Sequence, residues 1–77
     1  MNKARRKELD KAKTMLEEAK SILETARDEE QETYDNMPES LQGGEKGDKA
    51  QEAISELENA VDSLENVIES IDNAAGN

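Results

Sequence analysis

The stretch that decides the fold is DKAQEAISELENAVDSLENVIESIDN, residues 48–73. Its apolar residues fall into three seven-residue series, which are Ala50, Leu57, Leu64 and Ile71, then Ala53, Ala60, Val67 and Ala74, then Ile54, Val61 and Ile68. Such spacings gather apolar side chains on one side of an α-helix. Asp48 and Gln51 have the spacing of a capping box, so the helix is predicted over about 48–73. Residues 74–77 are predicted to form a tail.

A second amphipathic helix is predicted over about residues 3–34. Leucines recur every seven residues in it and alanines recur three positions later, at Leu9, Leu16 and Leu23 and at Ala12, Ala19 and Ala26. No Gly or Pro interrupts this stretch, and strong helix formers fill it. The two helices are predicted to pack antiparallel. Leu9 should then lie at the level of Ile71 and Ala74, Leu16 at that of Leu64 and Val67, and Leu23 at that of Leu57 and Ala60.

The apolar face of the second helix is broader than a two-helix seam needs. The predicted fold is therefore all-α, an antiparallel two-helix hairpin that assembles into a helical bundle as a dimer or a higher oligomer. An exposed apolar band is normally an interface. The residues expected to remain partly exposed in a lone hairpin and to mediate self-association are Met15, Ile22, Ile54, Val61 and Ile68.

The connection at residues 35–47 is longer than the 2–8 residues usual between packed helices. Residues 36–41 are predicted to form one capped turn of helix, with Asn36 as the cap, Pro38 early in the turn and Leu41 folding back on the core. Residues 43–47, which contain three glycines, are predicted to form a flexible hinge.

The amino-acid composition argues against metal sites, cofactors and catalysis. The chain has 77 residues with no Cys and no His, so the usual ligands of zinc, haem and iron–sulfur clusters are missing. We expect no cofactor and no dedicated metal site, including at the acidic residues 28–35, which lack the EF-hand pattern. The serines have no evident base, and an enzyme is not expected. The single domain is marginal in size, so a stable fold needs long helices, self-association or a partner.

Charge is distributed unevenly. Residues 1–27 carry 8 basic and 5 acidic side chains, and residues 28–77 carry 2 and 15, which gives the net charge of −10. Direct binding of nucleic acid is not expected of so acidic a body. The longest apolar runs have two or three residues, too few for a membrane span, and the basic N-terminal residues lead into no apolar secretory stretch.

Two charged series allow alternative interpretations. Arg6, Lys13, Lys20 and Arg27 flank the apolar stripe of the first helix. Their stems could cover that stripe while their charges pair with Glu17, Glu24 or the acids of a neighbouring chain, or they could form a rail for phosphates. The acidic series Glu58, Glu65 and Asp72 is either a solvated face or a contact for a basic partner, such as the N-terminal cluster of another copy or a groove that binds nucleic acid.

The turn is the most distinctive candidate for binding. Its residues are Tyr34, Asp35, Asn36, Met37, Pro38, Glu39, Ser40, Leu41 and Gln42. They either close the open end of the hairpin or contact a partner, with Tyr34 stacking on it. The residues considered for contacts to an anion are Arg5, Arg6, Arg27, Lys46 and Lys49.

The block DEEQETYDNMPESLQ, residues 28–42, resembles a family of short, uncharacterised proteins of bacteriophages and prophages. The resemblance implies a small accessory phage protein in the cytoplasm of a bacterial host, and no catalytic residue. By analogy, we expect a non-catalytic oligomer that antagonises antiviral defence by occluding a host protein surface. The alternatives are a sponge that sequesters a nucleotide signal in pockets between subunits, and a component of virion assembly.

Overall fold

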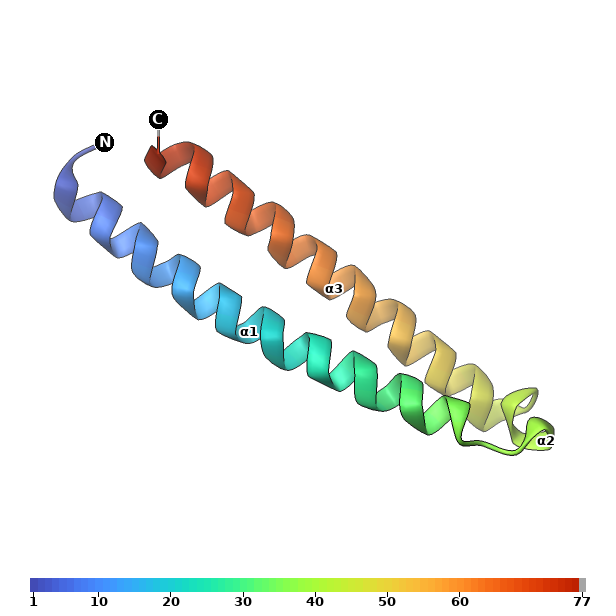
Figure 1. Cartoon of the computed structure of the whole chain (residues 1–77). Coiled ribbons are helices and arrows are strands. Elements are labelled where there is room, and N and C mark those ends of the chain that lie inside the picture. The colour runs from blue at the N-terminus through green and yellow to red at the C-terminus, as the bar shows by residue number, and fades with distance from the viewer. Residues whose placement is uncertain (77) are drawn as a thin grey trace.

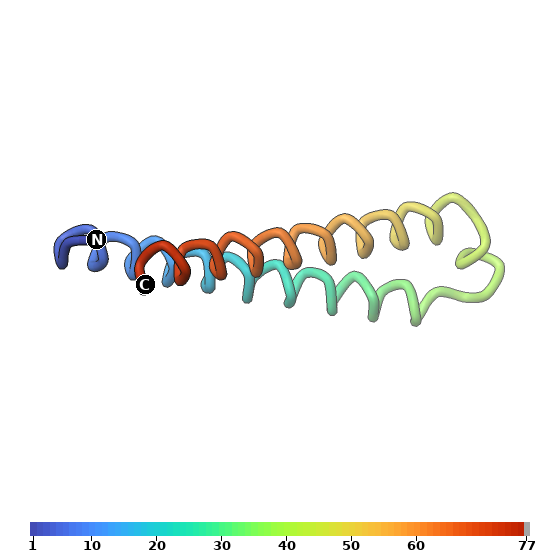
Figure 2. Tube along the Cα trace, turned by 90° about the horizontal axis from the view of Figure 1, so that it is seen from above, coloured from blue at the N-terminus to red at the C-terminus, as the bar shows by residue number. Residues whose placement is uncertain are grey.

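In the computed structural model, which describes residues 1–76, the chain forms a helical hairpin. Helix α1 spans Lys3–Asp35, the short helix α2 spans Glu39–Gln42, and helix α3 spans Glu45–Gly76. The long helices run antiparallel, side by side, and α2 closes one end (Figures 1 and 2). The hairpin is a rod of 58 × 14 × 13 Å. The all-helical prediction is confirmed, since no strand is present among residues 1–76.

Helix α1 begins at a side-chain cap. The side-chain oxygen of Asn2 accepts a hydrogen bond from the backbone N–H of Arg5 at 2.7 Å, which satisfies a donor that a helix terminus leaves free. The charges at the two ends are less favourable. The first turn has no acidic residue and the last turn has no basic residue. Both ends of α1 therefore oppose the helix macrodipole, which favours anions at the N-terminus and cations at the C-terminus.

The connection holds one turn of helix, as predicted, but its cap is different. Asn36 is the C-cap of α1, where its own backbone N–H donates to the Glu32 carbonyl at 3.0 Å and that of Met37 donates to the Tyr34 carbonyl at 3.1 Å. Pro38 precedes α2 instead, and its carbonyl accepts from Leu41 at 2.8 Å. The prediction that Leu41 folds back on the core is wrong, since this residue is 43% exposed.

The predicted hinge is shorter than residues 43–47, because only Gly43 and Gly44 lie between the helices α2 and α3. Helix α3 begins at Glu45, three residues before the predicted start, and the backbone N–H of Asp48 donates to the Gly44 carbonyl at 3.0 Å. Gly47 is buried in the first turn of α3, where an added Cβ would overlap the Gln42 carbonyl. Close backbone approach, rather than flexibility, explains this glycine. The predicted tail is helical through Gly76, and Asn77 lies outside the described residues.

Among residues 1–76, all of the buried apolar side chains come from α3. They are Ala50, Ile54 and Val61, and α1 contributes none that is fully buried. The expectation that Ile54 and Val61 stay partly exposed is therefore wrong, because both are buried, whereas Ile68 is half-buried and fits the expectation. Helix α3 is rotated so that this series faces α1.

The exposed apolar side chains lie elsewhere. Met15 is 62% exposed and Ile22 is 69% exposed, as predicted. Val67, which was predicted to face Leu16, is 44% exposed instead. The rotation of α3 that buries Ile54 and Val61 thus moves Val67 to the edge of the hairpin.

We predict that Gly47→Ala lowers the free energy of unfolding by about 1–3 kcal/mol, because its methyl group would overlap the backbone of Gln42 and force α2 away from α3. Gly43→Ala is the matched control. A Cβ at position 43 meets nothing within 4 Å, so its effect should stay within about 0.5 kcal/mol. Urea unfolding followed by circular dichroism measures both variants. Equal effects of the two substitutions would contradict the packing described at Gly47.

Candidate functional site

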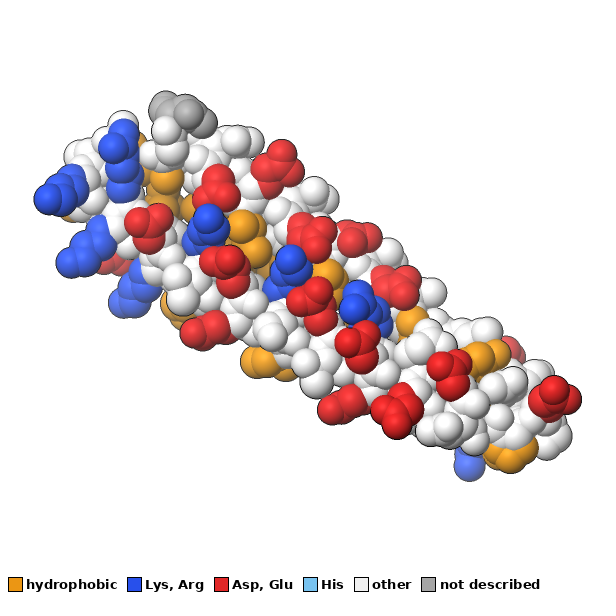
Figure 3. All heavy atoms as spheres, viewed as in Figure 1, with side chains coloured by type: hydrophobic (Ala, Val, Ile, Leu, Met, Phe, Trp, Pro, Cys, Tyr) orange, Lys and Arg blue, Asp and Glu red, His pale blue; other side chains and the backbone are white. Residues whose placement is uncertain are grey.

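One edge of the hairpin carries a ladder of polar contacts between α1 and α3. Lys13 Nζ lies 2.8 Å from Asp72 Oδ1, and Lys20 Nζ lies 3.2 Å from Glu65 Oε1. Gln51 Nε2 donates to the Tyr34 hydroxyl at 2.9 Å. We call these three pairs the polar ladder. Figure 3 shows basic side chains in a row along the rod, with acidic ones beside them.

The polar ladder defines a single antiparallel register. In each of its pairs the two residue numbers add up to 85, and the pairs are separated by whole heptads. Arg27 and Glu58 would form the remaining pair of this series. Arg27 instead contacts its neighbour Asp28, with Nε at 3.2 Å and Nη2 at 3.1 Å from Oδ1. Three of the four possible contacts are therefore made.

The partners of the lysines differ from those predicted. The sequence suggested Glu17, Glu24 or the acids of another chain, whereas the structure uses the acidic series of α3 in the same chain. The two series adjoin the seam on the same edge of the hairpin, and for that reason they meet. Their common register was the signal that could have identified the pairs from the sequence.

The predicted binding turn divides into an inner and an outer part. Tyr34, Met37 and Gln42 are half-buried, and Gln42 Nε2 donates to the Tyr34 carbonyl at 3.0 Å. Together with the contact to Gln51, these residues hold the turn against the helices. The outer part is exposed and consists of Asp35, Asn36, Pro38, Glu39, Ser40 and Leu41. We call these six residues the loop tip.

The basic residues considered for an anion site are not brought together in one chain. Arg5 and Arg6 lie at the end with the termini, whereas Lys46 and Lys49 lie at the loop end of a rod 58 Å long. Arg27 is held by Asp28, and Lys49 pairs with Glu45 at 3.2 Å. A single hairpin therefore assembles no cluster from these residues.

The edge opposite the polar ladder carries exposed apolar side chains. Met15, Ile22 and Val67 each come two positions after Lys13, Lys20 and Glu65. Two residues correspond to roughly 200° around a helix, so these side chains lie on the far side of their helices from the ladder. We call these three residues the apolar face.

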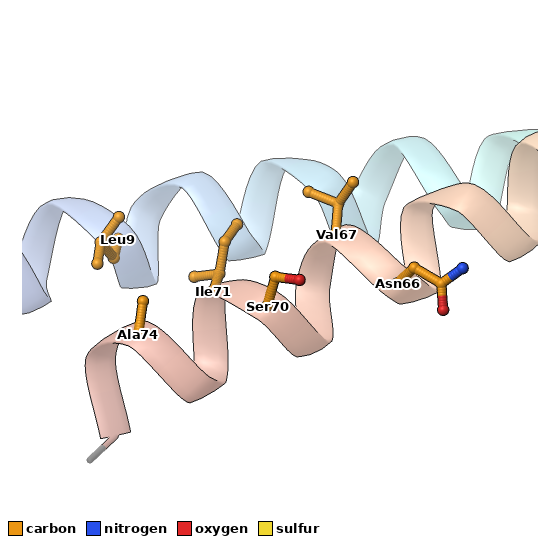
Figure 4. A pocket seen from close by; sticks show the side chains of 6 residues that line it. All are labelled: Leu9, Asn66, Val67, Ser70, Ile71 and Ala74. Carbon is orange, nitrogen blue, oxygen red and sulfur yellow. The ribbon is translucent and has the colours of Figure 1, made fainter.

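Shallow grooves adjoin the apolar face. One lies between the helices near the termini and is lined by Leu9, Asn66, Val67, Ser70, Ile71 and Ala74 (Figure 4). Leu9 therefore meets Ile71 and Ala74 at the predicted level. The other groove lies along α1 and is lined by Ser21, Ile22, Thr25, Ala26 and Glu29. The hairpin thus has a charged edge and, opposite it, an edge with exposed apolar side chains and shallow grooves.

The part of the chain that the structure describes offers neither a metal cluster nor a membrane span. No group of three or more acidic side chains among residues 1–76 is placed so that it could hold a metal ion. No helix of this part of the chain combines the length and the apolar character that crossing a membrane requires.

Comparison with known proteins identifies no matching family model, no similar curated protein and no similar solved structure. The resemblance of the central block to phage proteins therefore stays a prediction from the sequence.

One ion pair of the polar ladder shifts the pKa of Lys13. The hydrogen bond to Asp72, and then the negative charge of that carboxylate, raise the pKa of Lys13 above 10.5. Glu17 contributes less. Because the pKa is raised in the folded state, the stabilisation from this pair is fully present below pH 10.5 and is lost as the pH rises through the folded-state pKa.

We predict that Asp72→Asn returns the pKa of Lys13 toward 10.5, since it removes the acceptor charge, and that Glu17→Gln has a smaller effect. NMR titration of the lysine side-chain carbons measures both. If the Lys13 pKa were the same in Asp72→Asn as in the unmodified chain, the contact between Lys13 and Asp72 would not exist in solution.

Proposed function

We propose that this chain is a non-catalytic binding protein that associates with itself through the apolar face and engages a second protein through the loop tip. The observation that carries the proposal is the exposure of Met15, Ile22 and Val67 on one side of a hairpin with three buried apolar residues. A core this small leaves the chain dependent on further burial.

The apolar face supports self-association. Fully burying a side chain such as Ile or Met stabilises a complex by about 1.5–3 kcal/mol relative to leaving it exposed. Three such side chains on one edge, beside two shallow grooves, form the kind of patch that marks an interface. A bundle made from two hairpins would cover them.

The loop tip supports binding of a second partner. Tyr34 is anchored by Gln42 and Gln51, so the exposed residues are presented from a fixed base. Leu41 offers an apolar contact, and Asp35 and Glu39 place negative charge around it. This combination suits a protein surface that has an apolar hollow with a basic rim. Together with the resemblance to phage proteins, it favours occlusion of a host protein of antiviral defence in the bacterial cytoplasm.

The nucleotide sponge needs arginines from several copies around Tyr34. It has less support, because Arg27 is engaged by Asp28 and the Tyr34 hydroxyl by Gln51. A role in virion assembly would use the same apolar face with other copies of the chain, and the presence of the chain in purified particles would distinguish it.

We predict that the tagged chain captures one stoichiometric protein from bacterial lysate and that Leu41→Asp lowers this capture at least tenfold, because a charge would replace the apolar contact of the loop tip. Glu52→Gln, at an exposed position of α3 away from the tip, is the control and should capture normally. Quantitative mass spectrometry provides the readout. Undiminished capture by Leu41→Asp would exclude the loop tip as the contact. A strong thermal shift with one nucleotide and no protein partner would favour the sponge.

A further inference from the structure

The apolar face is centred on the middle of the rod. Helix α1 spans Lys3–Asp35, so its midpoint is Ala19, with Met15 four residues before it and Ile22 three residues after it. At 1.5 Å per residue, the two side chains lie about 6 and 4.5 Å from that midpoint along the axis. The register of the polar ladder places Val67 at the level of residue 18. All three exposed side chains therefore gather at the centre, where a two-fold axis would place each copy on the other.

Charge differs strongly between the two halves of the rod. Residues 20–64, which form the loop half, carry 4 basic and 13 acidic side chains, for a formal charge of −9. The rest of the chain forms the half with the termini and carries 6 basic and 7 acidic side chains, for a formal charge of −1. A pair of hairpins with both loops at one end would place the two −9 halves together. An antiparallel pair would place each −9 half beside a −1 half, which reduces the repulsion.

The charges of α1 point to the same arrangement. Its N-terminal residues include Lys3, Arg5, Arg6 and Lys7, and its C-terminal residues include Asp28, Glu29, Glu30 and Glu32. Each cluster opposes the dipole of its own helix. An antiparallel copy of α1 would bring the acidic C-terminal cluster of one chain against the basic N-terminal cluster of the other, at both ends.

We propose that the occupant of the apolar face is a second copy of this chain, packed antiparallel with its α1 against α1 and with the two-fold axis close to Ala19. This inference rests on the proposed self-association and specifies its geometry. Met15 of each copy packs on Ile22 of the other. Lys11 and Glu29 lie on the same stripe of α1, on either side of these residues, and pair between copies. Val67 lies close to the axis and meets its own counterpart on α3.

The size of the face suits this dimer. The whole side of the rod that carries the apolar face is 58 Å long and 14 Å wide, which is about 800 Å², the area that one partner contributes to a standard interface. The contact is isologous, so the same surface serves both copies and the assembly closes at two. The loop tips then lie at opposite ends of the dimer and stay exposed.

Solution mass and one substitution test the surface. We expect the full chain to have the mass of a dimer in light scattering. Ile22→Glu should raise the dissociation constant at least a hundredfold, because it places a carboxylate in the centre of the contact. Ile22 lies outside the hairpin core, so circular dichroism should show unchanged helix content. Glu52→Gln is the control and should remain dimeric.

Spin-label distances test the orientation. The chain has no cysteine, so single cysteines can be placed freely. Labels at Lys46→Cys, at the loop end, should lie at a distance approaching the 58 Å length of the rod, whereas labels at Glu17→Cys, near the axis but on the side of α1 away from the apolar face, should lie within about 30 Å of each other. A parallel dimer would reverse the first result by bringing both loop ends together.

The outcomes separate the two proposals. A dimer with a short Lys46→Cys distance would leave self-association intact and overturn the antiparallel geometry. A monomer at all concentrations would overturn both the geometry and the self-association on which it rests. Capture of a host protein by the loop tip is measured independently of either result.

Discussion

The polar ladder is the constraint on which the rest of the hairpin depends. Lys13–Asp72, Lys20–Glu65 and Tyr34–Gln51 join the same edge of both long helices in one register. A helix cannot present one edge to its neighbour without turning the opposite edge away. The contacts that hold Glu65 and Asp72 against α1 therefore bury Ile54 and Val61 and expose Val67. The apolar face and the polar ladder are two consequences of one rotation.

The energy of the fold and its specificity come from different residues. Burial of Ile54 and Val61 contributes about 1.5–3 kcal/mol each. Partly exposed ion pairs contribute much less, about 0.2–1 kcal/mol each, and salt screens them. The ladder nevertheless distinguishes among rotations of α3, because three apolar series span a wide face of that helix and the charged partners meet in only one register. A small electrostatic difference is enough to choose among alternatives of nearly equal hydrophobic energy.

The sequence predicted the elements well and their relative rotation poorly. Uninterrupted heptads predicted α1 within one residue, and the long connection predicted the extra turn at α2. Three apolar series on α3 span a wide face, and periodicity alone could not say which series meets α1. The start of α3 was missed because Asp48 has the spacing of a cap, whereas the packing of Gly47 on Gln42 depends on the folded backbone.

At the candidate site, the exposure of Met15 and Ile22 followed from their position beside the narrow stripe of α1. Tyr34 is held inward by a hydrogen bond from Gln51, which is 17 residues away in the sequence. No local sequence pattern predicts a contact between residues so far apart.

The central claim, that the polar ladder sets the rotation of α3, is tested most directly by a double-mutant cycle on Lys20 and Glu65. Lys20→Glu and Glu65→Lys should each lower the free energy of unfolding, and the double substitution should recover most of the loss. The expected coupling is about 0.5 kcal/mol, at the modest level of pairs whose carboxylate is half exposed. Urea unfolding at low salt provides the measurement, with the Ile22→Glu background used so that dissociation does not contribute. Strictly additive effects of the two charge reversals would contradict the account.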